Sequence, residues 1–153
     1  MAWSNSKIFS AFVTDVMNNT TAMDMNSDTL NVALYGVNTP DQTVASASSA
    51  YNTGQWITGN ELSNGGWIAG GLALASVTST FTTNVYTLDA ADRVGGATDT
   101  LTAVFGCLVF DFTIAAPVAK QGMSFNYFGG SQSVTSGSFT VVWNTSGILT
   151  LTL

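Results

Sequence analysis

The 153-residue sequence contains no histidine, and this absence restricts the chemistry that its other reactive residues could perform. Ser-His-Asp and Cys-His mechanisms need an imidazole as the general base, and His-bearing zinc and iron sites need it as a ligand. The cysteine Cys107 lies in the apolar run AVFGCLVF, so we expect a buried thiol. These classes of catalysis and metal site are excluded.

Carboxylate pairs remain as catalytic candidates, because two acids can hydrolyse a glycosidic bond without histidine. The candidate pairs are Asp89 with Asp92, and Asp111 with Glu61. Asp89-Ala-Ala-Asp92 occupies a position where a strand should turn, and acids are frequent in turns. We interpret these acids as turn and surface residues and expect no enzymatic activity.

The sequence DMNSD places Asp24, Asn26 and Asp28 at the spacing of the first three ligands of a calcium loop. The pattern then fails, since Thr29 stands where the loop requires glycine and Tyr35 stands where it requires a bidentate glutamate. We therefore interpret DMNSD as a polar turn between a helix and a strand, and we expect no metal ion or cofactor.

Glycine pairs and aromatic residues form a second group of motifs. Gly65-Gly66 and Gly70-Gly71 flank Trp67, but no Gly-Lys-Ser/Thr follows to hold a phosphate, so tight turns around a buried Trp are expected. The tryptophans and the motif FNYFGG at 125–130 leave two interpretations open: a carbohydrate platform, or packing in the core and at interfaces. Packing is favoured. The tryptophans are Trp3, Trp56, Trp67 and Trp143.

The segment SNSKIFSAFVTDVMNN predicts an amphipathic α-helix at residues 5–18, because its apolar residues recur at helical spacing and form one stripe. The stripe consists of Ile8, Phe9, Phe12, Val13, Val16 and Met17. Two roles remain open for it, packing on the core of the same chain or binding another subunit as an arm.

From residue 29 onward, alternation of apolar and polar residues replaces the helical period and indicates strands. In TLNVALYG, one face carries Leu30, Val32 and Leu34, which predicts a half-buried strand. The segment 38–64 reads as a long loop interrupted by a short strand at 55–58, and such loops often contact partners. Further strands are expected at 72–81, 84–90, 101–112 and 122–128.

The segment FTVVWNTSGILTLTL at 139–153 predicts a β-hairpin, with Leu149, Leu151 and Leu153 facing the core. Ile148, Thr150 and Thr152 then face outward. An uncharged edge strand without proline invites pairing with another chain. Either this strand lies inside the sheet, or a neighbouring copy completes it. The spacing of the strands predicts a single all-β domain, residues 1–153, folded as a mainly antiparallel sandwich or jelly-roll-like barrel with one N-terminal amphipathic helix.

Charge is sparse. Charged residues make up 8% of the chain, against about 25% in typical globular domains. The basic residues Lys7, Arg93 and Lys120 oppose nine acids, which gives a net charge of −6. A surface that follows phosphates needs several basic residues, so we expect no nucleic-acid binding and no attraction to anionic membranes. No apolar run approaches the roughly 20 residues of a membrane span.

Six motifs are distributed, in order, along nearly the whole chain: MAWSNSKIF, DTLNVALYG, AYNTGQWIT, WIAGGLALASVT, VFGCLVFD and FNYFGGSQSVTSGSFTVVWNTSGI. Together they resemble a family of small virion structural proteins of tailed phages, especially phages that infect actinobacteria. The resemblance implies a head-decoration or minor capsid protein, located in the virion and assembled in the host cytoplasm. It carries no catalytic signature and no set of functional residues.

The predicted function is therefore that of a capsid decoration or cement protein, which binds between capsomers and stabilises the head. Expected partners are the major capsid protein, or another virion protein, and further copies of the chain in a symmetric homo-oligomer such as a trimer. A tail or head–tail connector protein and a virion-surface carbohydrate-binding module are the alternatives. The residues expected at the interface are Ile8, Phe12, Tyr51, Trp56, Thr150 and Thr152.

Overall fold

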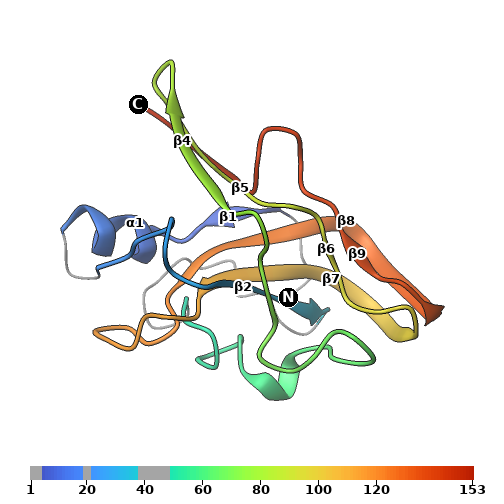
Figure 1. Cartoon of the computed structure of the whole chain (residues 1–153). Coiled ribbons are helices and arrows are strands. Elements are labelled where there is room, and N and C mark those ends of the chain that lie inside the picture. The colour runs from blue at the N-terminus through green and yellow to red at the C-terminus, as the bar shows by residue number, and fades with distance from the viewer. Residues whose placement is uncertain (1–4, 19–21, 38–48) are drawn as a thin grey trace.

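The structure, a computed structural model, describes residues 5–18, 22–37 and 49–153 (Figure 1). Residues 38–48 of the predicted loop and Trp3 lie outside the described residues. Within the described ranges, one α-helix, α1 (Ser10–Met17), accompanies antiparallel strands. The all-β class with one N-terminal helix is thereby confirmed.

Five strands form the largest sheet, in which β7 (Asp99–Asp111) and β8 (Gly122–Gly137) make the longest ladder (Figure 1). Both strands were predicted, but β8 continues beyond its expected end at Phe128. Gly129 and Gly130 adopt positive φ there, where the register between β7 and β8 shifts, and the strand resumes after this irregularity. The order across the sheet is β1 (Lys7–Ile8), β8 (Gly122–Gly137), β7 (Asp99–Asp111), β2 (Leu30–Gly36) and β3 (Leu72–Ala73).

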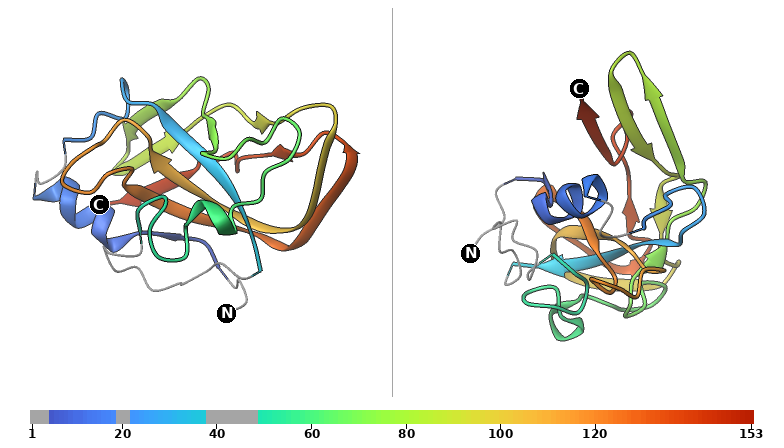
Figure 2. Two further views of the ribbon diagram at one scale, coloured as in Figure 1. Left: turned by 90° about the horizontal axis from the view of Figure 1, so that it is seen from below. Right: turned by 90° about the vertical axis from the view of Figure 1, so that its left-hand side faces the viewer.

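Two smaller sheets complete the fold. A three-stranded sheet projects away from the main body and is seen rising above it in the right-hand view of Figure 2. Its strands, in order, are β10 (Leu149–Thr152), β5 (Val85–Asp89) and β4 (Thr78–Thr82). The two-stranded sheet joins β6 (Arg93–Val94) to β9 (Thr140–Val141).

The predicted hairpin at 139–153 is wrong, because its two strands belong to different sheets. Strand β9 pairs with β6, and β10 pairs with β5. The turn at Asn144–Gly147 closes only an isolated bridge. Trp143 explains the separation: its backbone N–H donates to Asp92 at 3.0 Å and its indole N–H donates to the carbonyl of Ala91 at 3.2 Å, so this segment is held beside residues 91–92.

Two other strand predictions need correction. The expected strand at 72–81 is divided into β3 and β4, with Ser76 at a positive φ of 53° between them. No strand forms at 55–58, where the chain makes turns that lead into a 3-10 helix, η2 (Thr58–Asn60).

The helix begins later than the predicted residue 5. Lys7 and Ile8 form β1, which pairs with β8, and the N–H of Phe9 donates to the carbonyl of Met123 at 3.0 Å. Pairing with a neighbouring strand thus prevails over the helical spacing of these residues. Phe9 and Phe12 are buried in the core, whereas Met17 at the end of the stripe is 76% exposed.

Strand β2 was expected to be half-buried, but its residues from Leu30 to Tyr35 are all buried. The segment that follows the loop covers its second face. There the hydroxyl of Tyr35 donates to the carbonyl of Trp56 at 2.7 Å, and the two rings meet edge-on at 5.1 Å. The N–H of Leu62 donates to the carbonyl of Leu34.

Candidate interaction site

The acids proposed as catalytic pairs are each engaged in fixing a local turn or loop. Asp89 accepts a hydrogen bond from the next backbone N–H, and Asp92 accepts one from Trp143. The carboxylate of Glu61 accepts the hydroxyl of Tyr51 at 2.7 Å and the N–H groups of Gly70 and Gly71 at 3.0 Å. These partners account for the acids as structural residues.

The buried carboxylate of Asp99 was not singled out by the sequence, because a strand-initiating aspartate has no distinctive local pattern. It accepts hydrogen bonds from the backbone N–H groups of Gly66 at 2.7 Å, Gly96 at 3.0 Å and Phe139 at 3.1 Å. Burial opposes its ionisation, but these three donors outweigh burial and lower the pKa of Asp99. Asp99 therefore joins three loops.

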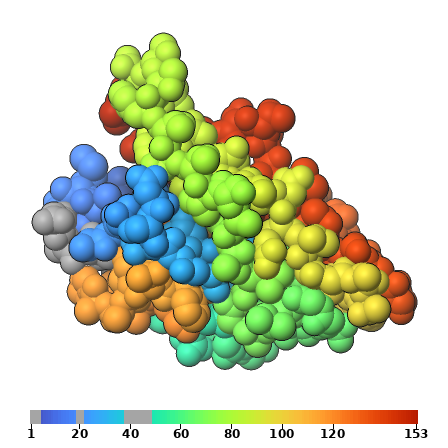
Figure 3. Space-filling view, viewed as in Figure 1, coloured from blue at the N-terminus to red at the C-terminus, as the bar shows by residue number. Residues whose placement is uncertain are grey.

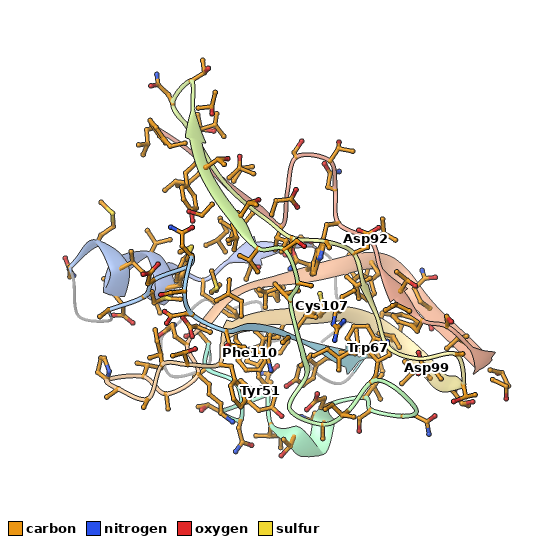
Figure 4. All side chains as sticks on the ribbon, in the orientation of Figure 1. Tyr51, Trp67, Asp92, Asp99, Cys107 and Phe110 are labelled. Atoms are coloured by element: carbon orange, nitrogen blue, oxygen red, sulfur yellow. The ribbon has the colours of Figure 1, made fainter. Side chains whose placement is uncertain are left out.

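The glycine pairs form the expected tight turns around Trp67, which is buried near Asp99 (Figure 4). The indole N–H of Trp67 donates to the carbonyl of Phe139 at 2.9 Å. Gly66 passes so close to Gly95 that a Cβ would lie 2.2 Å from the carbonyl carbon of Gly95. Glycine is thus required by contact between two backbones, and not by a bound phosphate.

The DMNSD segment forms a turn, as predicted. The carboxylate of Asp28 accepts the N–H of Asp24 at 2.7 Å, and that of Asp24 accepts the N–H of Asn26 at 3.0 Å. Within residues 5–18, 22–37 and 49–153, no three His, Cys, Asp or Glu side chains come together in a group that could hold a metal ion. The thiol of Cys107 is fully buried, which raises its pKa to about 12.

Asp111 contacts the DMNSD turn through the carboxyl group of Asp28. The pKa of Asp111 is raised to about 6, first by burial and also by the neighbouring carboxyl group of Asp28, although the N–H groups of Thr113 and Ile114 donate to Asp111 and oppose the shift. Because the pKa of Asp111 is higher in the folded state than the usual 3.8, the folded protein binds the proton more tightly than the unfolded chain does. This contribution to stability is complete below pH 3.8 and is lost as the pH rises through about 6.

We therefore expect Asp111→Asn to stabilise the protein at neutral pH by about 1 kcal/mol, after allowance for solvent screening. An asparagine Oδ1 can still accept from Thr113 and Ile114, so the turn is preserved while the buried charge is removed. Thermal unfolding measured at several pH values should show that the wild type loses stability between roughly pH 4 and 7 and that the variant loses less. Equal pH dependence in both proteins would contradict this account.

Three of the predicted interface residues are enclosed in the core. Phe12, Tyr51 and Trp56 are 6%, 4% and 0% exposed. Tyr51 stacks on Phe110 with ring centroids 4.5 Å apart, and Figure 4 shows the two residues side by side. Tyr51 and Trp56 are therefore core residues and not the predicted interface residues, whereas Phe12 belongs to the core cluster and also lines an apolar groove beside α1. Trp67 is also buried, so neither Trp56 nor Trp67 presents a face on which a sugar could stack.

An apolar groove with a volume of ≈ 680 Å³ lies between α1, the turn at 23–26 and one face of the projecting sheet. We call it the α1–β10 groove. Figure 3 shows the projecting residues of β4 and β5 standing above the N-terminal residues that form its other wall. Four of its lining side chains are large, apolar and exposed: Met17 (76%), Phe81 (59%), Leu151 (38%) and Leu153 (77%).

Alternation along the strands gives the projecting sheet two different faces. Tyr86 pairs with Phe81 on one side and Leu151 on the other, and all three line the groove. The opposite face carries a cross-strand row of threonines, Thr80, Thr87 and Thr150. The sequence did not single out Met23, Met25 or Phe81 for this surface, because the apolar face appears only when the strands pair.

The side chains of β10 follow the predicted alternation in part. Thr150 and Thr152 are exposed, as expected, but Leu151 and Leu153 face the open groove instead of a closed core. Ile148, predicted to face outward, is 7% exposed. The N–H of Ile148 donates to the carbonyl of Leu88, and Leu149 is also paired with Leu88. Ile148 and Leu149 thus both lie opposite Leu88, as in a β-bulge, and the side chain of Ile148 is turned inward.

A smaller and more polar hollow of ≈ 300 Å³ continues the groove along β10. The two share Ile8 and Leu149 in their linings. Two predicted interface residues of the N-terminal segment thus lie on this surface: the half-buried Ile8, which lines both hollows, and Phe12, which lines the groove. Lys7, Asn126 and Thr150 also line the smaller hollow.

Strand β10 forms an edge of its sheet and, within the part of the chain that the structure describes, pairs only with β5. The N–H of Leu153 donates to the carbonyl of Asn84 at 2.9 Å, towards β5. Since alternate residues of an antiparallel strand direct their backbone groups to the same side, those of Thr150 and Thr152 point to the open side. The strand carries neither a charge nor a proline to prevent pairing there.

Comparison of the chain with models of protein families, with curated proteins and with solved structures gave no match. Among the described residues, no helix has both the length and the apolar character needed to cross a membrane.

Proposed function

We propose that this protein is a structural protein of a tailed-phage virion, which acts by binding other virion proteins as a capsid decoration protein. The observation that carries the proposal is the exposed α1–β10 groove beside the open edge of β10. Contiguous exposed apolar surface is uncommon on monomeric soluble proteins and usually marks a site of interaction. The assignment to a phage virion is supported by the resemblance of the sequence motifs.

In this role the mechanism is energetic. Each contact between capsomers would bury roughly 1,000–2,000 Å² and add interface free energy that resists the pressure of packaged DNA. The major capsid protein and further copies of the chain, in a symmetric oligomer such as a trimer, are the proposed partners. A net charge of −6 suits an exterior position, because an acidic surface is repelled by packaged DNA.

A tail or head–tail connector protein would use the same surface at another place in the virion. Cryo-EM of particles that carry the protein distinguishes the two. We expect density distributed over the capsid lattice; density confined to the tail or neck would move the protein there.

A substitution at the edge of β10 tests the surface itself. We expect Thr152→Lys to fold normally, because Thr152 is exposed, and to weaken attachment to particles by about tenfold or more, because an edge lysine opposes strand pairing. The matched control is Thr80→Lys, which places the same charge on β4 at the opposite edge of the same sheet. Co-sedimentation of each purified protein with particles lacking it measures attachment. Equal attachment of both variants and the wild type would remove β10 from the contact.

A further inference from the structure

We infer that the α1–β10 groove receives an extended segment of another protein, which pairs with β10 as a fourth strand, places alternate apolar side chains in the groove and carries Lys or Arg beside them. This inference rests on the proposed function and specifies how that binding surface works.

The backbone of β10 supplies the first part of the argument. The N–H and C=O groups of Thr150 and Thr152 point to the open side of the sheet, where a further strand can pair with them. Peptides that extend a sheet in this way gain affinity from backbone hydrogen bonds and specificity from pockets for alternate side chains. The edge therefore favours an extended segment over a helix, because the backbone N–H and C=O groups inside a helix are already hydrogen-bonded to one another.

The groove supplies those pockets. Neighbouring strands place side chains on a common face, so every second residue of an added strand would lie beside Leu149, Leu151 and Leu153. The volume of ≈ 680 Å³ opens on this same face. Its opposite wall includes Met17, Met23 and Met25, whose unbranched side chains adapt to different apolar partners. The groove thus accepts alternate apolar residues without requiring one sequence.

Charge indicates the chemistry of the segment. Among the described residues that line the groove, Asp24 alone has a charged side chain, and the chain carries nine acids against three basic residues. A segment with Lys or Arg near its apolar residues is attracted to this surface, whereas an acidic segment is repelled.

A second copy of the chain fits the groove less well. The described turns that project furthest beside this surface, Thr83–Asn84 and Asn144–Gly147, are polar and offer no row of apolar side chains to fill the groove (Figure 1). A different protein is therefore the favoured source of the segment.

Selection from a random-peptide display library against the wild-type protein tests this inference. We expect enriched peptides with apolar residues at alternate positions and at least one Lys or Arg. Leu151→Asp and Leu153→Asp should each weaken their binding by about tenfold or more. Leu153 is 77% exposed, so its variant is expected to fold even if Leu151→Asp does not. Val142→Asp, which changes a residue that is 70% exposed outside the groove, is the matched control.

Amide hydrogen exchange adds a second readout. The amides of Thr150 and Thr152 should exchange more slowly when a selected peptide is bound, since the added strand accepts their hydrogen bonds. Failure to enrich peptides, peptides with apolar residues at helical spacing, affinity unchanged by Leu153→Asp, or unprotected amides would each overturn the inference. So would a dimer in sedimentation equilibrium that Leu153→Asp dissociates, because a second copy would then occupy the groove.

The two proposals can fail separately. If no peptide binds but Thr152→Lys still prevents attachment to particles, the strand-addition mode is wrong and the virion role stands. If the selected peptides bind as expected but the wild type does not attach to particles, the virion role is wrong and the groove remains a binding site for a basic, extended segment.

Discussion

Replacing Asp99 with alanine is expected to destabilise the protein by roughly 3–6 kcal/mol, because the backbone N–H groups of Gly66, Gly96 and Phe139 would each lose a buried acceptor. An unpaired buried donor costs about 1–3 kcal/mol, and the expected total lies in the lower part of the range for three donors because the hydrogen bonds from Gly66 and Gly96 are only part-buried. Since whole domains are stable by only about 5–15 kcal/mol, the variant should approach complete unfolding. Urea denaturation monitored by tryptophan fluorescence measures the change.

The control for this prediction is Asp92→Ala. Asp92 is exposed and accepts a single hydrogen bond, from the N–H of Trp143, so its loss should cost no more than about 1 kcal/mol. Similar stabilities for the two variants would show that Asp99 does not hold the three loops together.

Asp99 also sets the response of the protein to acid. Its pKa is lower in the folded protein than the usual 3.8, so the folded state binds the proton less tightly than the unfolded chain does. The stability that Asp99 contributes is present above pH 3.8 and is lost as the pH falls through its folded-state pKa. This direction is opposite to that of Asp111, whose contribution is lost as the pH rises through about 6.

Replacing Trp56 with alanine is expected to cost roughly 3–5 kcal/mol by opening a cavity in the core. Trp56 is fully buried, and its ring lies 6.0 Å from that of Phe9, 5.1 Å from that of Tyr35 and 5.8 Å from that of Phe125. The variant should therefore unfold at a much lower temperature in calorimetry, and any loss of binding should follow from unfolding.

Trp143→Ala is the matched control, because Trp143 is only half-buried and lies outside this aromatic cluster. We expect a smaller loss of stability. A stable, well-folded Trp56→Ala protein that no longer attaches to particles would restore Trp56 to the interface and contradict its place in the core.

Local sequence patterns correctly predicted several strands and turns, because alternation of apolar residues and turn-forming residue types act over a few neighbouring residues. Alternation in 84–90 and 101–112 identified β5 and β7, and the polar DMNSD turn was recognised from residue types alone. The positions of Gly65 and Gly70 likewise predicted turns with positive φ.

Contacts between distant segments decided the features that the sequence did not predict. The pairing of Leu149 with Leu88 separates β10 from β9, although the intervening Asn-Thr-Ser-Gly is a good hairpin turn. Phe9 fits a helical stripe, but its backbone bonds to Met123. The exposed groove could not be predicted either. Its apolar residues come from a helix, a turn and several strands that are spread along the sequence, and they come together only in the folded protein.

The position of β10 in the chain also determines when the proposed surface forms. Strands β4 and β5 are neighbours in the chain and need no residue beyond 89 in order to pair, but β10 follows far downstream, after β7 and β8. Until it arrives, β5 is open on the side that β10 later occupies, and Leu88, fully buried in the finished protein, is paired only on its other side, with Ser79 of β4. A nascent or truncated chain that ends before residue 149 therefore lacks both the edge and the leucines that would receive a partner. The proposed binding surface therefore requires residues 149–153, so chains that end before them would be excluded from assembly.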